Sequence, residues 1–450
     1  MSPCRNILQR KYIVLAVNTI NLFLCGGFPF NMSVLNVEFL RVFEDSKAQT
    51  ALVQAVTIGV LDIAGIIGGQ CVNKYGVRKV GMFGGLLAFL GLASSFFATG
   101  IRYLIVSIGV VAGFGFSLTF LSCLTSVGEY FDGKVKLVAI SIIGTGAGCG
   151  GMLFPFLMDY LIDMYGWRGC VLIVGGLMGN MICFFAVCKP NSVGVSRPKP
   201  ETCCSQDPDK TQLSSVHQHL HQDTDISNSS DIDLPKEQYT CTEKLNTLKK
   251  NVIFIIFVLG IALTLSSFGA ALIYMLEFLQ TKGFEEQEAL LFYFYMNTSA
   301  MLCRVLPGLC ILVPFIDGLV VSAFFTSLSC LTGVGLLIAT TYCHHVILMC
   351  VFGIALGCCN TVLSMTTMEL VGLDNYAIGI GIVMPVIGVS SIVAGAVSGW
   401  LVDVTGSYHT SYYSLSATHG VAVFLFILAI AVRKCCRSQT PYLDERTVFA

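Results

Sequence analysis

Residues 113–131, GFGFSLTFLSCLTSVGEYF, and residues 353–371, GIALGCCNTVLSMTTMELV, begin two stretches that correspond at a constant offset of 240 positions. The matching pairs are Phe28 and Phe268, Gly68 and Gly308, Gly113 and Gly353, Glu129 and Glu369, Gly148 and Gly388, Asp163 and Asp403, and Gly166 and Gly406. An offset one residue smaller aligns 37–40, VEFL, with 276–279, LEFL. Glycine is abundant, so no single pair is informative. Their agreement on one offset indicates two copies of one unit in the same order.

The composition indicates a membrane protein. The chain is 55% hydrophobic and only 12% charged, and its mean hydropathy is +0.77. Soluble domains carry about 25% charged residues, so this chain has too few to cover its surface in water. Two apolar halves in the same order, separated by a polar segment, are the pattern of transporters built from a parallel repeat.

Apolar runs long enough to cross a bilayer recur along both halves, and we expect about twelve transmembrane helices. The first half has runs at 13–37, 50–72, 80–98, 103–127, 138–160 and 170–188. The second half has runs at 252–276, 289–312, 315–340, 346–370, 376–402 and 412–432. Pro307 and Pro314 interrupt the segment 289–340, which holds the eighth and ninth runs. The predicted fold is therefore an all-α integral membrane protein of two parallel six-helix repeats.

The predicted organisation has five parts. They are an N-terminal tail (1–12), a first six-helix bundle (13–188), a polar loop (189–250), a second six-helix bundle (251–433) and a C-terminal tail (434–450). Twenty Lys and Arg residues fall on the side of the tails and the loop, and five fall on the other side. The positive-inside rule therefore places both tails and the loop in the cytoplasm. The first helix is expected to be retained, because its apolar run is too long for a signal peptide.

The polar loop and the cysteines carry no chemistry of their own. The loop is too polar to bury a core, so we expect a flexible tether. Its alternating His217, His219 and His221 lack the other ligands of a metal site, and the sequon at Asn228 lies on the cytoplasmic side. Most of the twenty cysteines fall inside spans, where they behave as small apolar residues. Cys435-Cys436, beside basic residues at the membrane exit, could instead be palmitoylated or stay unmodified.

The turn between the second and third spans resembles the signature loop of the major facilitator transporters. Residues 69–79 read GQCVNKYGVRK, with Asn73 where the signature normally has an acidic residue. The cations Lys74 and Arg78 can cap helix C-termini and bind nearby acids, which would hold one gate state. Glu129 and Glu369, at the inner ends of the fourth and tenth spans, are the expected partners. Ordinary positive-inside anchoring also explains the charges, but it does not explain the glycine spacing.

Further motifs resemble the monocarboxylate transporter family. They are 130–139, YFDGKVKLVA, 144–151, GTGAGCGG, 165–169, YGWRG, and 398–408, SGWLVDVTGSY. The first resembles the turn that opens the family's fifth span. The glycines let helices approach closely, for static packing or for sliding. The resemblance covers nearly all of the spans, and it implies a transporter in the plasma membrane with a possible single-span accessory glycoprotein as partner.

The chain departs from the family's lactate-transporting members at the residues that carry protons. Those members have a Lys after a Phe-Pro pair in the first span, where this chain has Phe30. They also place an Asp four residues before a buried Arg in the eighth span. Here the Arg is kept as Arg304, but Ala300 stands at the Asp position. Proton-coupled lactate transport therefore does not follow from the resemblance.

Arg304 is the leading candidate for substrate binding. An unpaired Arg inside a span costs about 2.5–3.5 kcal/mol on insertion scales, so it must face a cavity or a partner. Its planar guanidinium suits bidentate binding of a carboxylate. A salt bridge to Asp62, or to an acid on a neighbouring helix, is the structural alternative. Asp62, in the middle of the second span, is also the candidate for ion coupling, and Phe30, Asn31 and Asn297 are further candidates for the substrate site.

The sequence thus predicts a monocarboxylate-transporter-like carrier for a small organic anion or zwitterion, working by alternating access. The alternative is a transport-dead membrane sensor or scaffold that keeps the fold. A soluble enzyme is excluded by composition, and we find no nucleophile–base constellation and no phosphate-cradling loop. We expect no cofactor, no metal and no nucleic-acid partner; the partners are the solute and the lipid bilayer.

Overall fold

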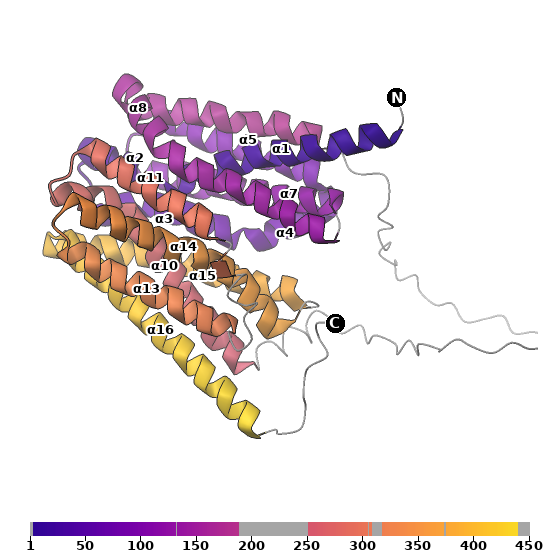
Figure 1. The fold of residues 1–450 in the computed structure, drawn as a ribbon. Coiled ribbons are helices and arrows are strands. Elements are labelled where there is room, and N and C mark those ends of the chain that lie inside the picture. Colours follow the sequence, from indigo (N-terminus) through magenta and orange to yellow (C-terminus); the bar gives the residue numbers. More distant parts are fainter. Residues whose placement is uncertain are drawn as a thin grey trace, which may run out of the picture.

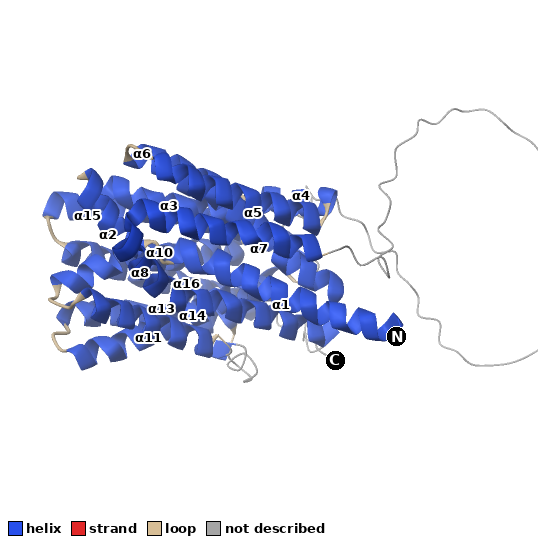
Figure 2. Cartoon of the chain, turned by 90° about the horizontal axis from the view of Figure 1, so that it is seen from above, coloured by secondary structure: helices blue, strands red, loops and turns tan. Residues whose placement is uncertain are grey.

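The computed structural model describes residues 3–131, 133–188, 251–304, 306–307, 317–372 and 375–439. Helices joined by short turns make up these residues (Figures 1 and 2). The α-helices of the first half are α1 (Pro3–Phe30), α2 (Ser33–Phe43), α3 (Lys47–Ile63), α4 (Gly65–Tyr75), α5 (Val77–Ser94), α6 (Ile101–Leu104), α7 (Gly113–Tyr130) and α8 (Gly133–Val187). Those of the second half are α10 (Val252–Thr281), α11 (Glu286–Cys303), α13 (Gly318–Ile338), α14 (Tyr342–Val371), α15 (Tyr376–Thr405) and α16 (Tyr408–Gln439). A 3₁₀ turn (Ser95–Phe97) follows α5, and a π-helix (Ile105–Ala112) leads into α7.

The two halves of the chain form two bundles that lie side by side. In Figure 1 the indigo-to-magenta helices of the first half form one layer and the orange-to-yellow helices of the second half form the other. Two helix pairs make most of the contact between the bundles: α3 packs against α15, and α8 packs against α11. This arrangement follows from the repeat, because α3 and α11, and likewise α8 and α15, occupy equivalent positions in the two copies.

The long helices run roughly parallel to one another, so the molecule has two end faces. The start of α1 and the end of α16 lie at one end, which we call the terminal face (Figure 1). The turns from α2 to α3, from α10 to α11 and from α15 to α16 lie at the other end, which we call the distal face. The first described helix thus begins, and the last one ends, on the same side of the bundle, as an even number of crossings requires.

Nine helices in the described part of the chain are long and apolar enough to cross a bilayer, or ten when α3 and α4 count as one span bent by 47°. α8 counts once, yet it contains two antiparallel helices. Its backbone leaves the helical region at Gly166 (φ 67°), a conformation that favours glycine. The Sγ of Cys170 donates to the carbonyl oxygen of Met158 at 3.7 Å, although twelve residues of straight helix would separate them by about 18 Å. α8 thus covers two of the predicted spans, and α11 lies at the eighth predicted span. The total of twelve spans stays a prediction from the sequence.

The first span is broken where the sequence predicted a continuous helix. The chain leaves the helix at Asn31 and Met32 and resumes as α2. Pro29, inside the last turn of α1, lacks an N–H and crowds the preceding turn, which favours a break there. α1 also begins at Pro3, so its helix extends into the segment predicted as an N-terminal tail.

Several predictions concern residues outside the described part of the chain. These are the polar loop 189–250 with its histidines and Asn228, Pro314 between the eighth and ninth predicted runs, and the C-terminal tail beyond Gln439. Of the predicted tail, residues 434–439 continue α16 as helix.

Candidate functional site

Arg304 lies at the contact between the two bundles. It caps the C-terminal end of α11, the helix of the second half that packs against α8. Its Nη1 atom lies 4.0 Å from the position that a Cβ would occupy at Gly144 of α8. Its Nε atom is buried and has no hydrogen-bond partner among the described residues. Arg304, the leading candidate for substrate binding, therefore lies beside α8 at the boundary between the bundles.

Small residues of α8 make room for the side chains of α11. A Cβ at Gly148 would lie 2.9 Å from Cγ of Met301, and a Cβ at Gly151 would lie 2.7 Å from Oδ1 of Asn297. Gly144, Gly148 and Gly151 are spaced four and three residues apart, so they share one face of the helix. These three glycines of the run 144–151 thus face α11 across the bundle boundary, whereas Gly146 and Gly150 approach α1.

The described residues include no acidic partner for Arg304. The three ion pairs found in that part of the chain join Arg41 to Glu38, and Arg433 to Asp317 and to Glu369. Asp62, the predicted structural partner, belongs to the other contact between the bundles. Its Cβ lies 3.1 Å from the position of a Cβ at Gly388 of α15. Arg304 and Asp62 thus sit at different helix pairs, α8 with α11 and α3 with α15, and the proposed salt bridge between them is not present.

The other candidate substrate residues divide into two groups. Asn297 lies two helical turns before Arg304 and faces α8, while its Nδ2 donates to the carbonyl oxygen of Tyr293 at 3.0 Å. Asn31 is buried at the break between α1 and α2, where its Nδ2 donates to the carbonyl oxygen of Gly27 at 2.7 Å. Phe30 ends α1 and is 38% exposed. The structure therefore brings Asn297 to the same helix pair as Arg304, whereas Phe30 and Asn31 belong to the first span.

The predicted gating residues lie at the terminal face. Asn73 and Lys74 are in the last turn of α4, Gly76 makes the turn with φ 85°, and Arg78 is in the first turn of α5. The Nε atom of Arg78 is buried without a hydrogen-bond partner among the described residues. Glu129 lies next to the last residue of α7.

Glu369 has its partners within its own bundle. Its Oε2 accepts the backbone N–H of Gly318 at 2.9 Å, and its Oε1 accepts Nη1 of Arg433 at 2.7 Å. Gly318 is the first residue of α13, so the carboxylate sits at a helix N-terminus, where negative charge is favourable. In this conformation Glu369 ties α14 to α13 and α16, and it does not contact Lys74 or Arg78.

The sequence analysis missed a set of contacts that joins the bundles at the distal face. The carboxylate of Asp403, near the end of α15, accepts the backbone N–H groups of Lys47 and Ala48 at 2.9 and 3.0 Å. The hydroxyl of Tyr274 on α10 donates to the carbonyl oxygen of Lys47 at 3.3 Å. Asp403 had been noticed only as the repeat partner of Asp163. The signal that could have indicated its role was the helix start at Ser46-Lys47, whose first N–H groups need acceptors.

The comparisons with known proteins agree with this architecture. Residues 19–310 match the family model described as the Major Facilitator Superfamily. The model matches most of the length of the chain, and the structure has two bundles with a cation between them. The chain therefore belongs to the Major Facilitator Superfamily of membrane transporters. The members of this class are not enzymes.

Several curated relatives that are similar to this chain are named monocarboxylate transporters. Monocarboxylate transporter 14 of Homo sapiens is 24% identical over 472 residues, covering 93% of this chain and 90% of the relative. Monocarboxylate transporter 2 of Homo sapiens is 26% identical over 415 residues, covering 90% and 82%. Monocarboxylate transporter 9 of Gallus gallus is 34% identical over a shorter stretch, 43% of this chain and 38% of the relative. The family resemblance predicted from the sequence is thus confirmed.

Solved structures confirm the fold. A bacterial homologue of the human lysosomal transporter Spinster, in an inward-facing and unoccupied conformation, superposes with a TM-score of 0.68 at 13% identity. The match covers 94% of this chain and 96% of that one. A D-xylose–proton symporter superposes with a TM-score of 0.64 at 14% identity, covering 92% and 97%.

Proposed function

We propose that the protein carries a small organic anion or zwitterion across the membrane and that Arg304 binds the carboxylate of this solute. The observation that supports the proposal is the half-buried side chain of Arg304 between the bundles, whose buried Nε has no hydrogen-bond partner and which has no acid partner among the described residues. Burying such a charge without a counter-charge is costly, and a carboxylate with two acceptor oxygens would offset that cost. Asn297, on the same face of α11, would supply a neutral polar contact.

The mechanism that we propose is alternating access by rocking of the two bundles. Asp403, Lys47 and Tyr274 join the bundles at the distal face. With the terminal face in the cytoplasm, as the distribution of cations predicts, this arrangement is closed to the outside. The similarity to an inward-facing transporter structure supports the same assignment. Lys74, Arg78 and Glu129 would then form contacts between the bundles in the opposite, outward-facing state.

Phe30 and Ala300, which stand where the family's lactate carriers have their proton-carrying pair, favour weak coupling of solute transport to protons. Ala300 is buried, and its backbone lies so close to Gly357 of α14 that a Cβ there would overlap it. This position therefore faces its own bundle and holds no titratable group. Asp62, at the other contact between the bundles, is the remaining candidate for coupling. Residence in the plasma membrane and an accessory glycoprotein stay predictions from the family.

Substitution of Arg304 tests the proposal. Lys keeps the charge but loses the paired, coplanar donors, so Arg304→Lys should weaken apparent affinity about ten- to a hundredfold, the equivalent of roughly 1.5–3 kcal/mol. The assay is counterflow of labelled monocarboxylates and amino acids in proteoliposomes. The matched control is Arg168→Lys, because Arg168 has a structural role: it donates to the carbonyl oxygen of Ala98 at 3.0 Å and stacks on Trp167. That variant should keep its affinity.

Two outcomes would contradict the proposal. Unchanged counterflow by an Arg304→Lys protein that reaches the membrane at normal levels would remove Arg304 from the substrate site. Saturable binding of a solute without any counterflow in the unsubstituted protein would instead identify a membrane sensor that keeps the fold.

A further inference from the structure

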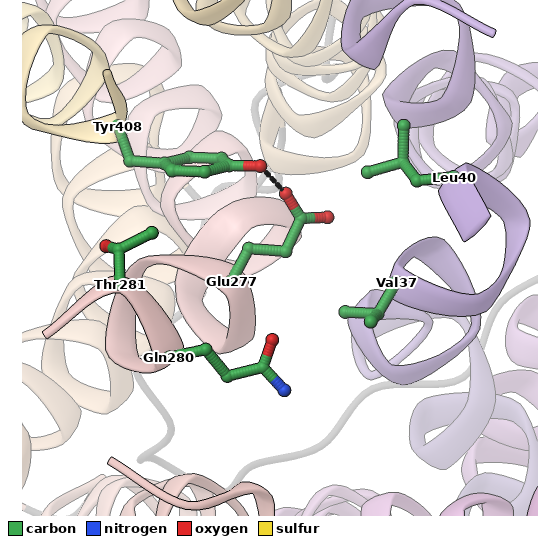
Figure 3. Close-up of a pocket in the computed structure, with 6 residues that line it drawn as sticks. All are labelled: Val37, Leu40, Glu277, Gln280, Thr281 and Tyr408. Atoms are coloured by element: carbon green, nitrogen blue, oxygen red, sulfur yellow. Dashed lines mark hydrogen bonds between the residues drawn. The ribbon is translucent and has the colours of Figure 1, made fainter. Parts of the chain in front are cut away.

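A pocket at the distal face lies between the first spans of the two repeats. Its volume is about 380 Å³. It is lined by Val37 and Leu40 of α2, Glu277, Gln280 and Thr281 of α10, and Tyr408 of α16 (Figure 3). The two apolar residues come from the first bundle and the four polar residues come from the second. A ligand here would therefore touch both bundles.

Glu277 presents an unsatisfied carboxylate oxygen in this pocket. The side chain is only 7% exposed. Its Oε2 accepts the hydroxyl of Tyr408, while its Oε1 is buried without a hydrogen-bond partner (Figure 3). Figure 3 shows that this second oxygen points away from Tyr408, toward the side where Val37 and Leu40 lie. A buried acceptor without a hydrogen bond destabilises the folded protein, and more so when the group is charged.

Two cations that are close to the pocket residues in the sequence, Lys282 and Lys47, have other contacts. Lys282 donates from Nζ to the carbonyl oxygen of Leu337 at 2.6 Å. The Nζ of Lys47 lies over the ring of Tyr408, 4.2 Å from its centre. In the described part of the chain, neither of them forms an ion pair with Glu277.

The repeat shows that the missing cation is specific to the second half. At the offset of 239, Glu277 corresponds to Glu38 and Gln280 corresponds to Arg41. In the first half, Arg41 pairs with Glu38 at 3.0 Å. In the second half the acid is kept as the buried Glu277, whereas the neutral amide Gln280 stands at the position of Arg41. Arg41 thus pairs with Glu38 in the first repeat, whereas the second repeat has no cation at the equivalent position to pair with Glu277.

We propose that this pocket binds a small organic cation, a protonated primary amine with a short apolar stem. The ammonium would donate to Oε1 of Glu277. The side-chain oxygen of Gln280 stands three residues further along α10 and so shares a face with the carboxylate. The stem would lie against Val37 and Leu40. This volume falls within the size range of small-molecule sites and, together with the apolar wall, favours an organic cation over a bare metal ion, which prefers a shell of oxygens.

The amine site is distinct from Arg304 in place and in charge. It lies at the distal face, and its occupant would connect the bundles only while that face is closed. A bound amine would therefore stabilise the closed distal face. The site does not depend on which solute the central cation binds, and its test needs no transport measurement.

Protection of an introduced thiol tests the site in the purified full-length protein in nanodiscs. Thr281→Cys puts a reporter at the exposed rim of the pocket, in a Cys343→Ser background because Cys343 is also exposed. The rate of labelling by a bulky thiol reagent is followed at that peptide by mass spectrometry. At ten times its Kd, n-butylammonium should slow labelling about tenfold. n-Butanol, which has the stem without the charge, and sodium chloride should leave the rate unchanged.

Two variants connect the protection to Glu277. Glu277→Gln should abolish it, whereas Glu38→Gln, the equivalent change in the first repeat, should retain it. Leu40→Trp, which fills the pocket from the opposite wall and leaves the carboxylate in place, should also abolish protection if Glu277→Gln does not fold. Equal protection by sodium would show an inorganic cation site. No protection by n-butylammonium, or protection that survives both Glu277→Gln and Leu40→Trp, would overturn the proposal.

Discussion

The carboxylate of Asp403, near the end of α15, accepts the backbone N–H of Lys47, the first residue of α3, at 2.9 Å. Its other oxygen accepts the next N–H along the chain, that of Ala48, at 3.0 Å. The first N–H groups of a helix have no partner within the helix, and negative charge is favourable there. The second bundle thus supplies a cap to a helix of the first. Any motion that opens the distal face must break this contact.

Asp403→Asn should favour opening of the distal face. The amide keeps one acceptor oxygen but directs an NH₂ group at the second N–H. Loss of a cap costs about 1–2 kcal/mol, a factor of roughly 5–30 in the equilibrium between closed and open. Electron–electron resonance between spin labels on unnatural amino acids at Glu44 and Thr405 should show a larger share of long distances. Asp163→Asn, the equivalent change in the first repeat, should leave the distribution as it was. Identical distributions for Asp403→Asn and the unsubstituted protein would show that the cap does not hold this face closed.

Gly388→Ala should disturb the contact between the bundles more than Gly148→Ala does, although the two glycines occupy equivalent positions in the repeat. A Cβ at Gly388 would lie 2.6 Å from the backbone oxygen of Gly59, which is fixed in α3. A Cβ at Gly148 would meet Cγ of Met301, a flexible side chain that can move aside. We expect Gly388→Ala to lower stability by about 1–3 kcal/mol and to slow counterflow. Thermal unfolding of both variants in the same detergent makes the comparison, and equal melting temperatures would contradict it.

Solute flux should depend only weakly on an inward proton gradient. Phe30 and Ala300 stand where the family's lactate carriers place a titratable pair, and Asp62 is the remaining candidate at the bundle contacts. Uptake into proteoliposomes at several outside pH values measures the dependence. Any residual acceleration at low pH should disappear in Asp62→Asn. A strong acceleration that survives this substitution would place the coupling group elsewhere.

Arg433 and Glu369 should be coupled more strongly than Arg41 and Glu38. Arg433 is 19% exposed and its carboxylate partner 27%, whereas the side chain of Arg41 is 70% exposed. Exposed ion pairs contribute about 0–1 kcal/mol to stability. Partial burial, together with the hydrogen bond from the N–H of Gly318, should raise the coupling energy of Arg433 and Glu369 above that range. A double-mutant cycle with Gln at each position, read from thermal unfolding, gives both coupling energies. A larger coupling for the Glu38 pair would reverse the expectation.

The bundle architecture could be predicted because hydropathy and repetition are properties of the linear chain. The offset that matches Gly148 to Gly388 indicated two equivalent units, and apolar runs located the spans to within a few residues. Breaks inside the spans were less visible. Pro29 indicated a weak point but not that α1 would end at Phe30, since the same residue can also kink a helix without ending it.

The sequence by itself determined that this chain is a membrane transporter of two parallel repeats with a cation, Arg304, inside a span. Only the tertiary structure decided what each polar residue faces. Asp403 and Lys47 are 356 positions apart, and Tyr408 and Glu277 are 131 apart. Hydropathy does not indicate which sides of two distant helices meet. The physical reason is that the hydropathy of each residue decides whether a segment can lie in the bilayer. The partner of a buried polar group depends instead on how whole helices pack against one another.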